Sequence, residues 1–251
     1  MTPRDIARRG ALFLDFDGTL VEIAPRPDAI AVAPGLPALL RAVSAATGGA
    51  TALLSGRTID TLDGFLAPAR LAAAGGHGAE LRRAPDAPLE HHAGPRLPPS
   101  WLAVAETLAA SHRGAILECK PVGFTLHARG CPDALPLFAE ALAALVRQDP
   151  HFSLLHAHMA VEVRPSGADK GVALTALMQA PPFSGRVPVF VGDDVTDEDA
   201  IAAARRLGGI GLRVDEAFGS PAGVRAWLGE IAAAGGEGAA SAIVGAERGV
   251  S

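Results

Sequence analysis

The residues of this chain that could carry chemistry gather in four short motifs. They are DFDGT (15–19), SGR (55–57), Lys170 at the start of a predicted helix, and GDDVTDED (192–199). Five carboxylates fall within the eight residues of the last motif. Oxygen ligands of this kind, with no Cys or His beside them, favour Mg²⁺. Such an ion, a lysine and oriented N–H groups together suit the neutralisation of a phosphoryl group during attack by a carboxylate.

Each motif taken singly also has a purely structural interpretation. An Asp at a strand end, such as Asp15 or Asp17, often only caps a loop, and Ser-Gly is a common turn. A lysine at a helix start is usually solvated, and acidic residues are favoured at helix N-termini by the macrodipole. However, Asp15, Asp17 and the four Asp of 192–199 would repel one another strongly at one rim without a cation. The combination therefore favours a metal-dependent site.

The elements that must position these motifs follow an α/β pattern. Short apolar runs alternate with helix-period segments, which indicates parallel βαβ units and a Rossmann-like, doubly wound sheet. Ligands bind at the carboxyl ends of parallel strands, so this fold would bring the four motifs to one rim. Strands are predicted at 11–15, 50–54, 71–74, 187–191 and 209–214, and helices at 34–46, 58–66 (with Thr58 as its cap), 170–178, 197–206 and 223–234.

The pattern changes in the middle of the chain. A Pro-, Ala- and His-rich connector at 83–99 precedes a segment of α-β-β-α-β-β order, whose short turns, such as Pro121-Val122, indicate antiparallel pairing. We therefore expect an α+β unit inserted into the parallel core. Its elements are predicted at 99–111, 115–120, 123–129, 132–148, 152–156 and 160–164. The predicted domains are residues 1–90 with 166–235 for the core, 91–165 for the insert, and a disordered tail at 236–251.

Composition limits the classes of partner. The net charge is −5 and no basic run occurs, so nucleic acid is not expected to bind. Cys119 and Cys131 are the two cysteines, too few for a disulfide framework or a cysteine metal cluster. Apolar stretches fall short of the roughly 20 residues that a membrane span requires. We expect a cytoplasmic protein that is monomeric and binds no membrane.

The ordered set of DFDGT, SGR, a distant Lys and GDD-x-x-D resembles the haloacid-dehalogenase-like phosphatases. This resemblance implies that Asp15 attacks phosphorus and forms an aspartyl-phosphate, while Asp17 acts as general acid and base. It also implies a Mg²⁺ held by Asp15, the Asp17 backbone carbonyl and Asp193. Asp194 and Asp197 would complete the metal site directly or through waters.

The phosphate would be bound by residues of three motifs. Gly18 lets the backbone curl toward the phosphate, and Ser55 offers its hydroxyl. Gly56 offers a backbone N–H, and Lys170 supplies a compact charge beside Asp15. Lys170 thereby joins Asp15 and Asp17 as a predicted catalytic residue.

Motifs outside this set narrow the resemblance. GHGAE (76–80), ECK (118–120), TLHAR (125–129) and VEVRPSGADKG (161–171) resemble the trehalose-6-phosphate phosphatases over nearly the whole chain. In that family the insert is a cap, and its charged residues grip the distal glucose. TLHAR departs from the family's usual HYR by reading HAR. The substrate-binding residues implied or matched in this way are Glu118, Lys120, Arg129 and Glu162 on the cap, and Arg57 and His77 on the core.

Other interpretations remain open for the insert and for the reaction. His77 and Glu80 match the family, yet they could tie core to cap instead of touching substrate. Without the resemblance, Glu118, Lys120 and Arg129 would be taken for a solvated sheet face. The resemblance implies hydrolysis of trehalose 6-phosphate, the last step of trehalose biosynthesis. Its rivals are a sucrose-phosphate or mannosyl-phosphate phosphatase, a phosphomutase, and a non-catalytic binding protein.

Overall fold

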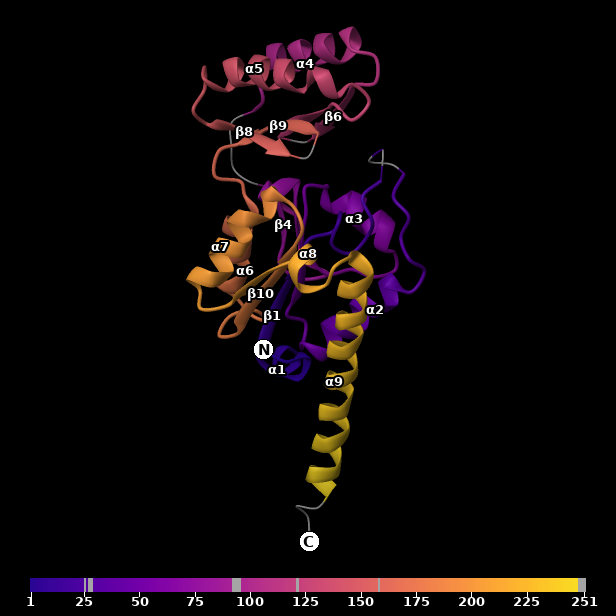
Figure 1. The fold of residues 1–251 in the computed structure, drawn as a ribbon. Helices are drawn as coiled ribbons and strands as arrows, with labels where there is room; N and C mark the ends of the chain where they lie inside the picture. Colours follow the sequence, from indigo (N-terminus) through magenta and orange to yellow (C-terminus); the bar gives the residue numbers. More distant parts are fainter. Residues whose placement is uncertain (25, 27–28, 92–95, 121, 158, 248–251) are drawn as a thin grey trace.

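The structure is a computed structural model that describes residues 1–24, 26, 29–91, 96–120, 122–157 and 159–247, with side chains as far as 236. The predicted turn at Pro121 therefore lies outside the described residues. Figure 1 shows two lobes stacked one on the other. The helices are α1 (Pro3–Arg9), α2 (Leu36–Ala46), α3 (Ile59–Leu66), α4 (Pro99–Ser111), α5 (Leu135–Val146), α6 (Lys170–Met178), α7 (Glu198–Arg206), α8 (Val214–Ala217) and α9 (Pro221–Glu247), with short 3₁₀ turns η1 (Gly76–Gly78), η2 (Pro132–Ala134) and η3 (Val195–Asp197).

The larger sheet forms the core of the lower lobe. Its order, across the described residues, is β11-β10-β1-β2-β3-β4-β5, and the run from β11 to β3 is parallel. Strands β4 and β5 follow with antiparallel pairing, and β5 forms the edge. The predicted doubly wound α/β core is confirmed. The strands are β1 (Gly10–Leu14), β2 (Thr51–Leu54), β3 (Ala72–Gly75), β4 (Glu80–Arg82), β5 (Glu90–His91), β10 (Val187–Gly192) and β11 (Ile210–Arg213).

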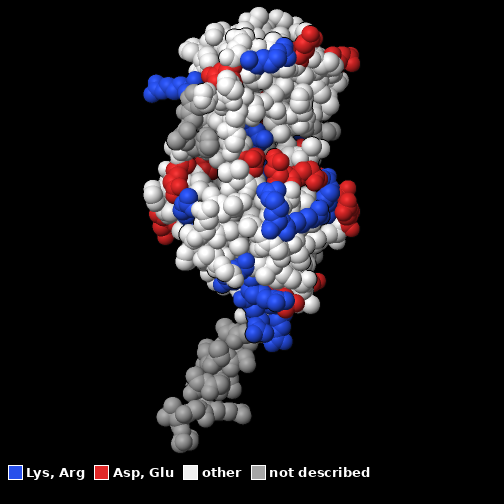
Figure 2. Space-filling view, turned by 90° about the vertical axis from the view of Figure 1, so that its left-hand side faces the viewer, with Lys and Arg blue, Asp and Glu red and all other residues white. Residues whose placement is uncertain are grey.

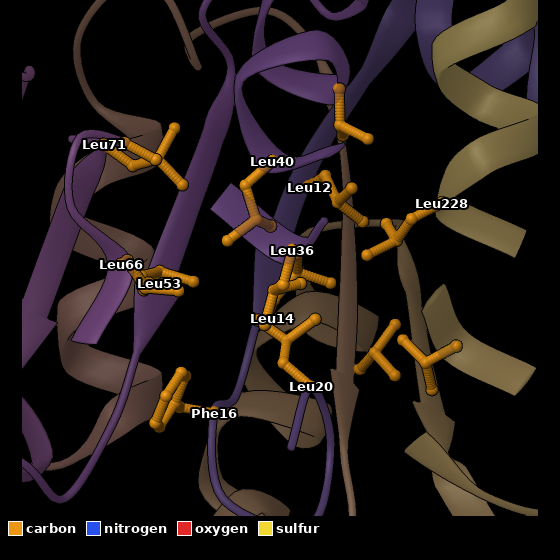
Figure 3. Packing of buried hydrophobic residues seen from close by; sticks show 14 of the residues in the cluster. Leu12, Leu14, Phe16, Leu20, Leu36, Leu40, Leu53, Leu66, Leu71 and Leu228 are labelled. Atoms are coloured by element: carbon orange, nitrogen blue, oxygen red, sulfur yellow. The ribbon is translucent and has the colours of Figure 1, made fainter. Parts of the chain in front are cut away.

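Strand β1 lies inside the larger sheet, between β10 and β2, and both of its faces are buried. Leu12 and Leu14 pack on one side against the helices α2 and α9, through Leu36 and Leu228 (Figure 3). Phe13 points to the other side, into the cluster that includes residues of α6 and α7. Burial of each large side chain contributes about 1.5–3 kcal/mol. Two helical layers thus fix the height and direction of β1, and Asp15 follows at its carboxyl end.

The upper lobe is the predicted α+β insert, called the cap below. Its sheet runs β6-β7-β9-β8 with antiparallel pairing throughout. Helices α4 and α5 cover the outer face, and Trp101 of α4 and Phe138 of α5 lie in one buried cluster with Phe124 of β7. The other face turns toward the core (Figure 1). The strands are β6 (Ile116–Lys120), β7 (Gly123–His127), β8 (Phe152–Ala157) and β9 (Ala160–Pro165).

Several elements differ from the sequence-based prediction. Helix α1 and the strands β4 and β5 were not predicted, whereas Thr58 caps α3 as predicted. Helix α9 continues to Glu247, beyond the predicted end at residue 234. The boundaries of the domains and the disorder of 236–251 stay predictions. Within the described residues, none of the helices has the length and apolar character needed to cross a bilayer.

Candidate active site

Asp15 lies at the carboxyl end of β1, where it is 5% exposed. Its Oδ1 accepts a hydrogen bond from Lys170 Nζ at 2.6 Å. The same ammonium donates to Asp197 Oδ1, also at 2.6 Å. Lys170 is the first residue of α6, whose N-terminus is capped by the Asp169 side chain. Strand β1, helix α6 and the turn after β10 thus bring three of the four motifs together.

This cluster holds more negative than positive charge. Burial would lower the pKa of Lys170, but Asp15 and Asp197 outweigh it and raise that pKa, so the ammonium keeps its charge. Burial raises the pKa of Asp15 well above its usual range, and Asp193 and Asp197 add to the rise. Burial, with Asp197 next, also raises the pKa of Asp193 to about 6. Both carboxyl groups therefore lie in a place that a further cation would stabilise.

Oxygen atoms of Asp15, Asp193 and Asp197 lie within 4.8 Å of one another, which fits a metal ion. Thr19 Oγ1 lies 3.1 Å from Asp193 Oδ1 and holds that carboxylate in place. Gly18 makes room for it: φ is +78°, and a Cβ there would collide with the Asp193 carboxylate. The Gly18 N–H donates to the Val21 carbonyl at 2.8 Å, so its visible role is to shape the turn.

Asp197 and Asp194, the other predicted metal ligands, are occupied by protein donors. Asp197 is fully buried, and its Oδ2 accepts the backbone N–H groups of Asp193 and Asp194 at 2.9 and 3.0 Å. Its Oδ1 accepts from Lys170, as described above. The Asp194 side chain accepts from the Val195 N–H at 2.7 Å and caps η3. Asp197 therefore braces the loop after β10, and direct contact with a metal is best matched by Asp15 and Asp193.

Arg57 holds Asp17, although the sequence had placed Arg57 among the substrate contacts. Its Nε and one terminal nitrogen donate to the two Asp17 carboxylate oxygens at 2.6 and 2.8 Å. The guanidinium also lies 5.9 Å from the ring centroid of Phe16 and 5.1 Å from that of Phe65. Cation–π contact adds to the bidentate pair, so the Arg57 head group has a fixed position.

The second motif forms a tight turn between β2 and α3. Ser55 Oγ accepts the backbone N–H of Arg57 at 3.2 Å. Buried Glu80 accepts the N–H of Ile59, the first residue of α3, at 2.8 Å. Glu80 therefore fixes the turn from within the core. His77 covers the turn, because a Cβ on Gly56 would lie 2.5 Å from His77 Nε2.

On the cap, Glu162 of β9 accepts hydrogen bonds from residues of β6 and β7. Lys120 Nζ donates at 2.6 Å and Thr125 Oγ1 at 2.9 Å. His77 Nε2, from the core, lies 3.3 Å from the same oxygen. Burial would raise the pKa of Glu162, but Lys120 and His77 outweigh it, and the pKa lies well below its usual value. Glu162 is thus a carboxylate within a preformed polar cluster.

The remaining cap residues are also engaged. Glu118 Oε2 lies 2.8 Å from His127 Nε2. Burial would raise the pKa of Glu118, but the hydrogen bond to His127 outweighs it and lowers that pKa. Arg129 donates to the backbone carbonyl of Ala24 on the core. Thr125 and His127 were missed as candidate site residues, although both share the strand face of the predicted ones, two residues apart.

A cleft of about 630 Å³ separates the two lobes. Asp15 and Lys170 lie on its core side, and Glu118, Lys120 and Glu162 lie on its cap side. In the space-filling view, acidic side chains gather along the seam below the cap (Figure 2). All the predicted site residues except Gly18 and Asp197 line this cleft, and those two support it from below.

A family model described as trehalose-phosphatase matches residues 13–221, which include every residue of the cleft. The chain belongs to the trehalose-phosphatase family. It is 41% identical over 230 residues to a probable trehalose-phosphate phosphatase of Sinorhizobium fredii, covering 89% of this chain and 86% of that one. It is 38% identical over 213 residues to the trehalose-6-phosphate phosphatase of Escherichia coli, covering 84% and 79%.

The fold of this trehalose-phosphatase chain matches solved structures. The C-terminal domain of the Candida albicans trehalose-6-phosphate phosphatase aligns with a TM-score of 0.74 at 19% identity, covering 92% of this chain and 94% of that one. A haloacid dehalogenase-like hydrolase of Bacteroides thetaiotaomicron aligns with a TM-score of 0.60 at 16% identity, covering 89% and 99%. The predicted haloacid-dehalogenase-like core with an inserted cap is confirmed. Membership places the chain among the phosphoric monoester hydrolases.

Proposed function

We propose that this protein hydrolyses trehalose 6-phosphate to trehalose and phosphate, with Asp15 as nucleophile. The observation that carries the proposal is the buried Asp15–Lys170 pair at the core side of a cleft whose cap side bears Glu118, Lys120 and Glu162. The core end suits a phosphate, because Lys170 is held charged there. The cap end suits a polyhydroxylated leaving group, because its carboxylates and ammonium group can form many hydrogen bonds.

The reaction would proceed in two displacements. The Asp15 carboxylate attacks phosphorus, the ester P–O bond breaks, and Asp17 gives a proton to the departing sugar oxygen. A water molecule then attacks the aspartyl-phosphate, Asp17 takes its proton, and phosphate leaves with Asp15 restored. Both Asp17 oxygens accept bonds from Arg57 in this structure, and each oxygen keeps a second lone pair, so Arg57 can orient Asp17 while it transfers the proton.

Mg²⁺ is the proposed cofactor. Asp15, Asp193 and the Asp17 backbone carbonyl would hold it, while Asp194 would contribute through water. When bound, the ion supplies positive charge that offsets the negative phosphoryl oxygens. The support is the donor set, which consists of hard oxygen atoms in a place with too little positive charge. A cytoplasmic location and a monomeric state stay predictions.

The test is release of phosphate from a panel of esters, with and without Mg²⁺. We expect trehalose 6-phosphate to have a kcat/KM well above those of sucrose 6-phosphate, a mannosyl phosphate and glucose 6-phosphate, and EDTA to abolish turnover. Equal rates on hexose phosphates would contradict the proposal that trehalose 6-phosphate is the preferred substrate. Isomerised sugar phosphate without free phosphate would identify a mutase. Asp15→Asn should abolish turnover while leaving the thermal unfolding temperature unchanged. Retained activity would refute the assignment of Asp15 as the nucleophile.

A further inference from the structure

His77 joins the phosphate end of the cleft to the sugar end. It lies on the core in η1, and its Nε2 is 3.3 Å from Oε2 of Glu162 on the cap strand β9. Two other contacts also link the lobes, from Arg129 to the Ala24 carbonyl and from Arg164 to Asp199 at 4.0 Å. The His77 contact differs because both partners are buried, at 7% and 3% exposure. Solvent therefore screens it far less than the others.

The backbone around His77 is built to aim its ring at the cap. Its φ is 54°, in the left-handed region that residues other than Gly rarely adopt. Gly76 and Gly78 beside it also have positive φ. Strain of this kind persists where the surrounding structure imposes it and is frequent at functional sites. Gly56 leaves the space that the ring occupies, since a Cβ there would lie 2.5 Å from Nε2.

The ring does more than fill space. Its Nδ1 is buried and has no hydrogen-bond partner among the described residues. An apolar ring would avoid the cost of an unpaired Nδ1, so what the imidazole adds here is its other nitrogen, Nε2, which reaches Glu162. Burial lowers the pKa of His77, so the ring is neutral at pH 7 and acts on Glu162 as a hydrogen-bond donor.

We propose that His77 is a positioning residue that sets Glu162 for the sugar and thereby makes the cleft selective for long substrates. The inference rests on the proposed function, in which Glu162 binds the distal sugar. Lys120 and Thr125 hold Glu162 from the cap itself, whereas His77 holds it from the core. The position of the sugar contact is thereby tied to the phosphate turn at Gly56. A short phosphate ester does not reach Glu162, so its hydrolysis does not depend on His77.

The first experiment compares His77→Asn with wild type on trehalose 6-phosphate and on p-nitrophenyl phosphate. Asn tolerates positive φ, so this change removes the ring and keeps the turn. We expect KM for the sugar phosphate to rise about tenfold, with kcat and the kinetics of the aryl ester within twofold of wild type. His77→Gln carries its amide N–H donor one methylene farther out than Asn does, nearer to the position of Nε2, and should fall between the two. Equal losses on both substrates would mean a general structural role and would overturn the inference.

The second experiment is a double-mutant cycle with Glu162→Gln. If His77 acts through Glu162, His77→Asn should change KM by less than twofold in the Glu162→Gln background. Multiplied effects in the double variant would overturn the inference. Should wild type prefer another sugar phosphate, the proposed substrate fails while the cycle, run on that sugar phosphate, still tests His77. Wild type that hydrolyses only the aryl ester would overturn both.

Discussion

Arg57 and Asp17, 40 residues apart, form a bidentate ion pair with donor–acceptor distances of 2.6 and 2.8 Å. The pair sits beside the Phe16 and Phe65 rings, so the guanidinium is held on more than one side. Asp17 is therefore held in a defined position, two residues after the proposed nucleophile Asp15. Its proposed acid and base roles would then depend on Arg57, which the sequence analysis placed among the substrate-binding residues.

Arg57→Lys should lower kcat by about tenfold or more, because an ammonium cannot chelate both oxygens and small misplacements of catalytic groups are costly. Steady-state kinetics with trehalose 6-phosphate would measure this, with KM expected to change little. Arg41→Lys, an exposed change on α2, is the matched control. A rise in KM with unchanged kcat would instead support the original role of Arg57 as a substrate contact.

Lys170→Met should destabilise the fold by about 3–5 kcal/mol in EDTA, because it leaves Asp15 and Asp197 buried without their counter-charge. Urea unfolding would measure the loss. The double variant with Asp15→Asn should recover part of it by removing one of the stranded charges. A single variant within 1 kcal/mol of wild type would show that the cluster does not depend on the ammonium.

Gly18→Ala should reduce activity by about a hundredfold, because the new methyl group would displace the Asp193 carboxylate. Gly185→Ala is the matched control, since its φ of +77° is almost the same and its Cβ would meet nothing within 4 Å. In both variants the free energy of unfolding should fall by about 1–2 kcal/mol, because Ala is disfavoured in the left-handed backbone conformation. Phosphate release and urea unfolding together separate the two effects, and equal activity in both variants would contradict a special role for Gly18.

Glu162 should give the protein an acid-sensitive stability. Its pKa is lowered by folding from a usual value of 4.5, so the unfolded state takes up the proton first as the pH falls. The stabilisation is then fully present above about pH 4.5 and is lost below it. In urea unfolding between pH 3 and 7, the stability of Glu162→Gln should depend less on pH than that of wild type. Glu140→Gln, exposed on α5, should follow wild type.

Local patterns predicted the fold well where one face or both faces of an element are buried. The strand 187–191 and the helix 170–178 follow from apolar runs and periodicity, and the structure has them at Val187–Gly192 and Lys170–Met178. Helix α1 was not predicted, although the sequence contains a signal for its start. Thr2 and Asp5 form a capping box, with Pro3 between them. Strands β4 and β5 have three and two residues and are too short to show a period.

The site was predictable as a set of residues but not as a set of contacts. Motif order placed Asp15, Lys170 and Asp193 at one rim, since strand ends meet there. The pairing of Arg57 with Asp17, and the use of both Asp197 oxygens by protein donors, depend on rotamers that only packing selects. The contact of His77 with Glu162 depends on how the cap sits on the core, which short-range patterns do not describe.

The place of β1 in the sheet also decides when the site can exist during synthesis. Thr19 and its partner Asp193 are 174 residues apart, and Asp15 and Lys170 are 155 apart. At typical translation speeds of about 5–20 residues per second, roughly 10–35 s pass between the emergence of Thr19 and that of Asp193. A nascent chain therefore displays the proposed nucleophile long before it has the lysine and the second carboxylate. The proposed chemistry can begin only after the ribosome has also delivered the loop that follows β10.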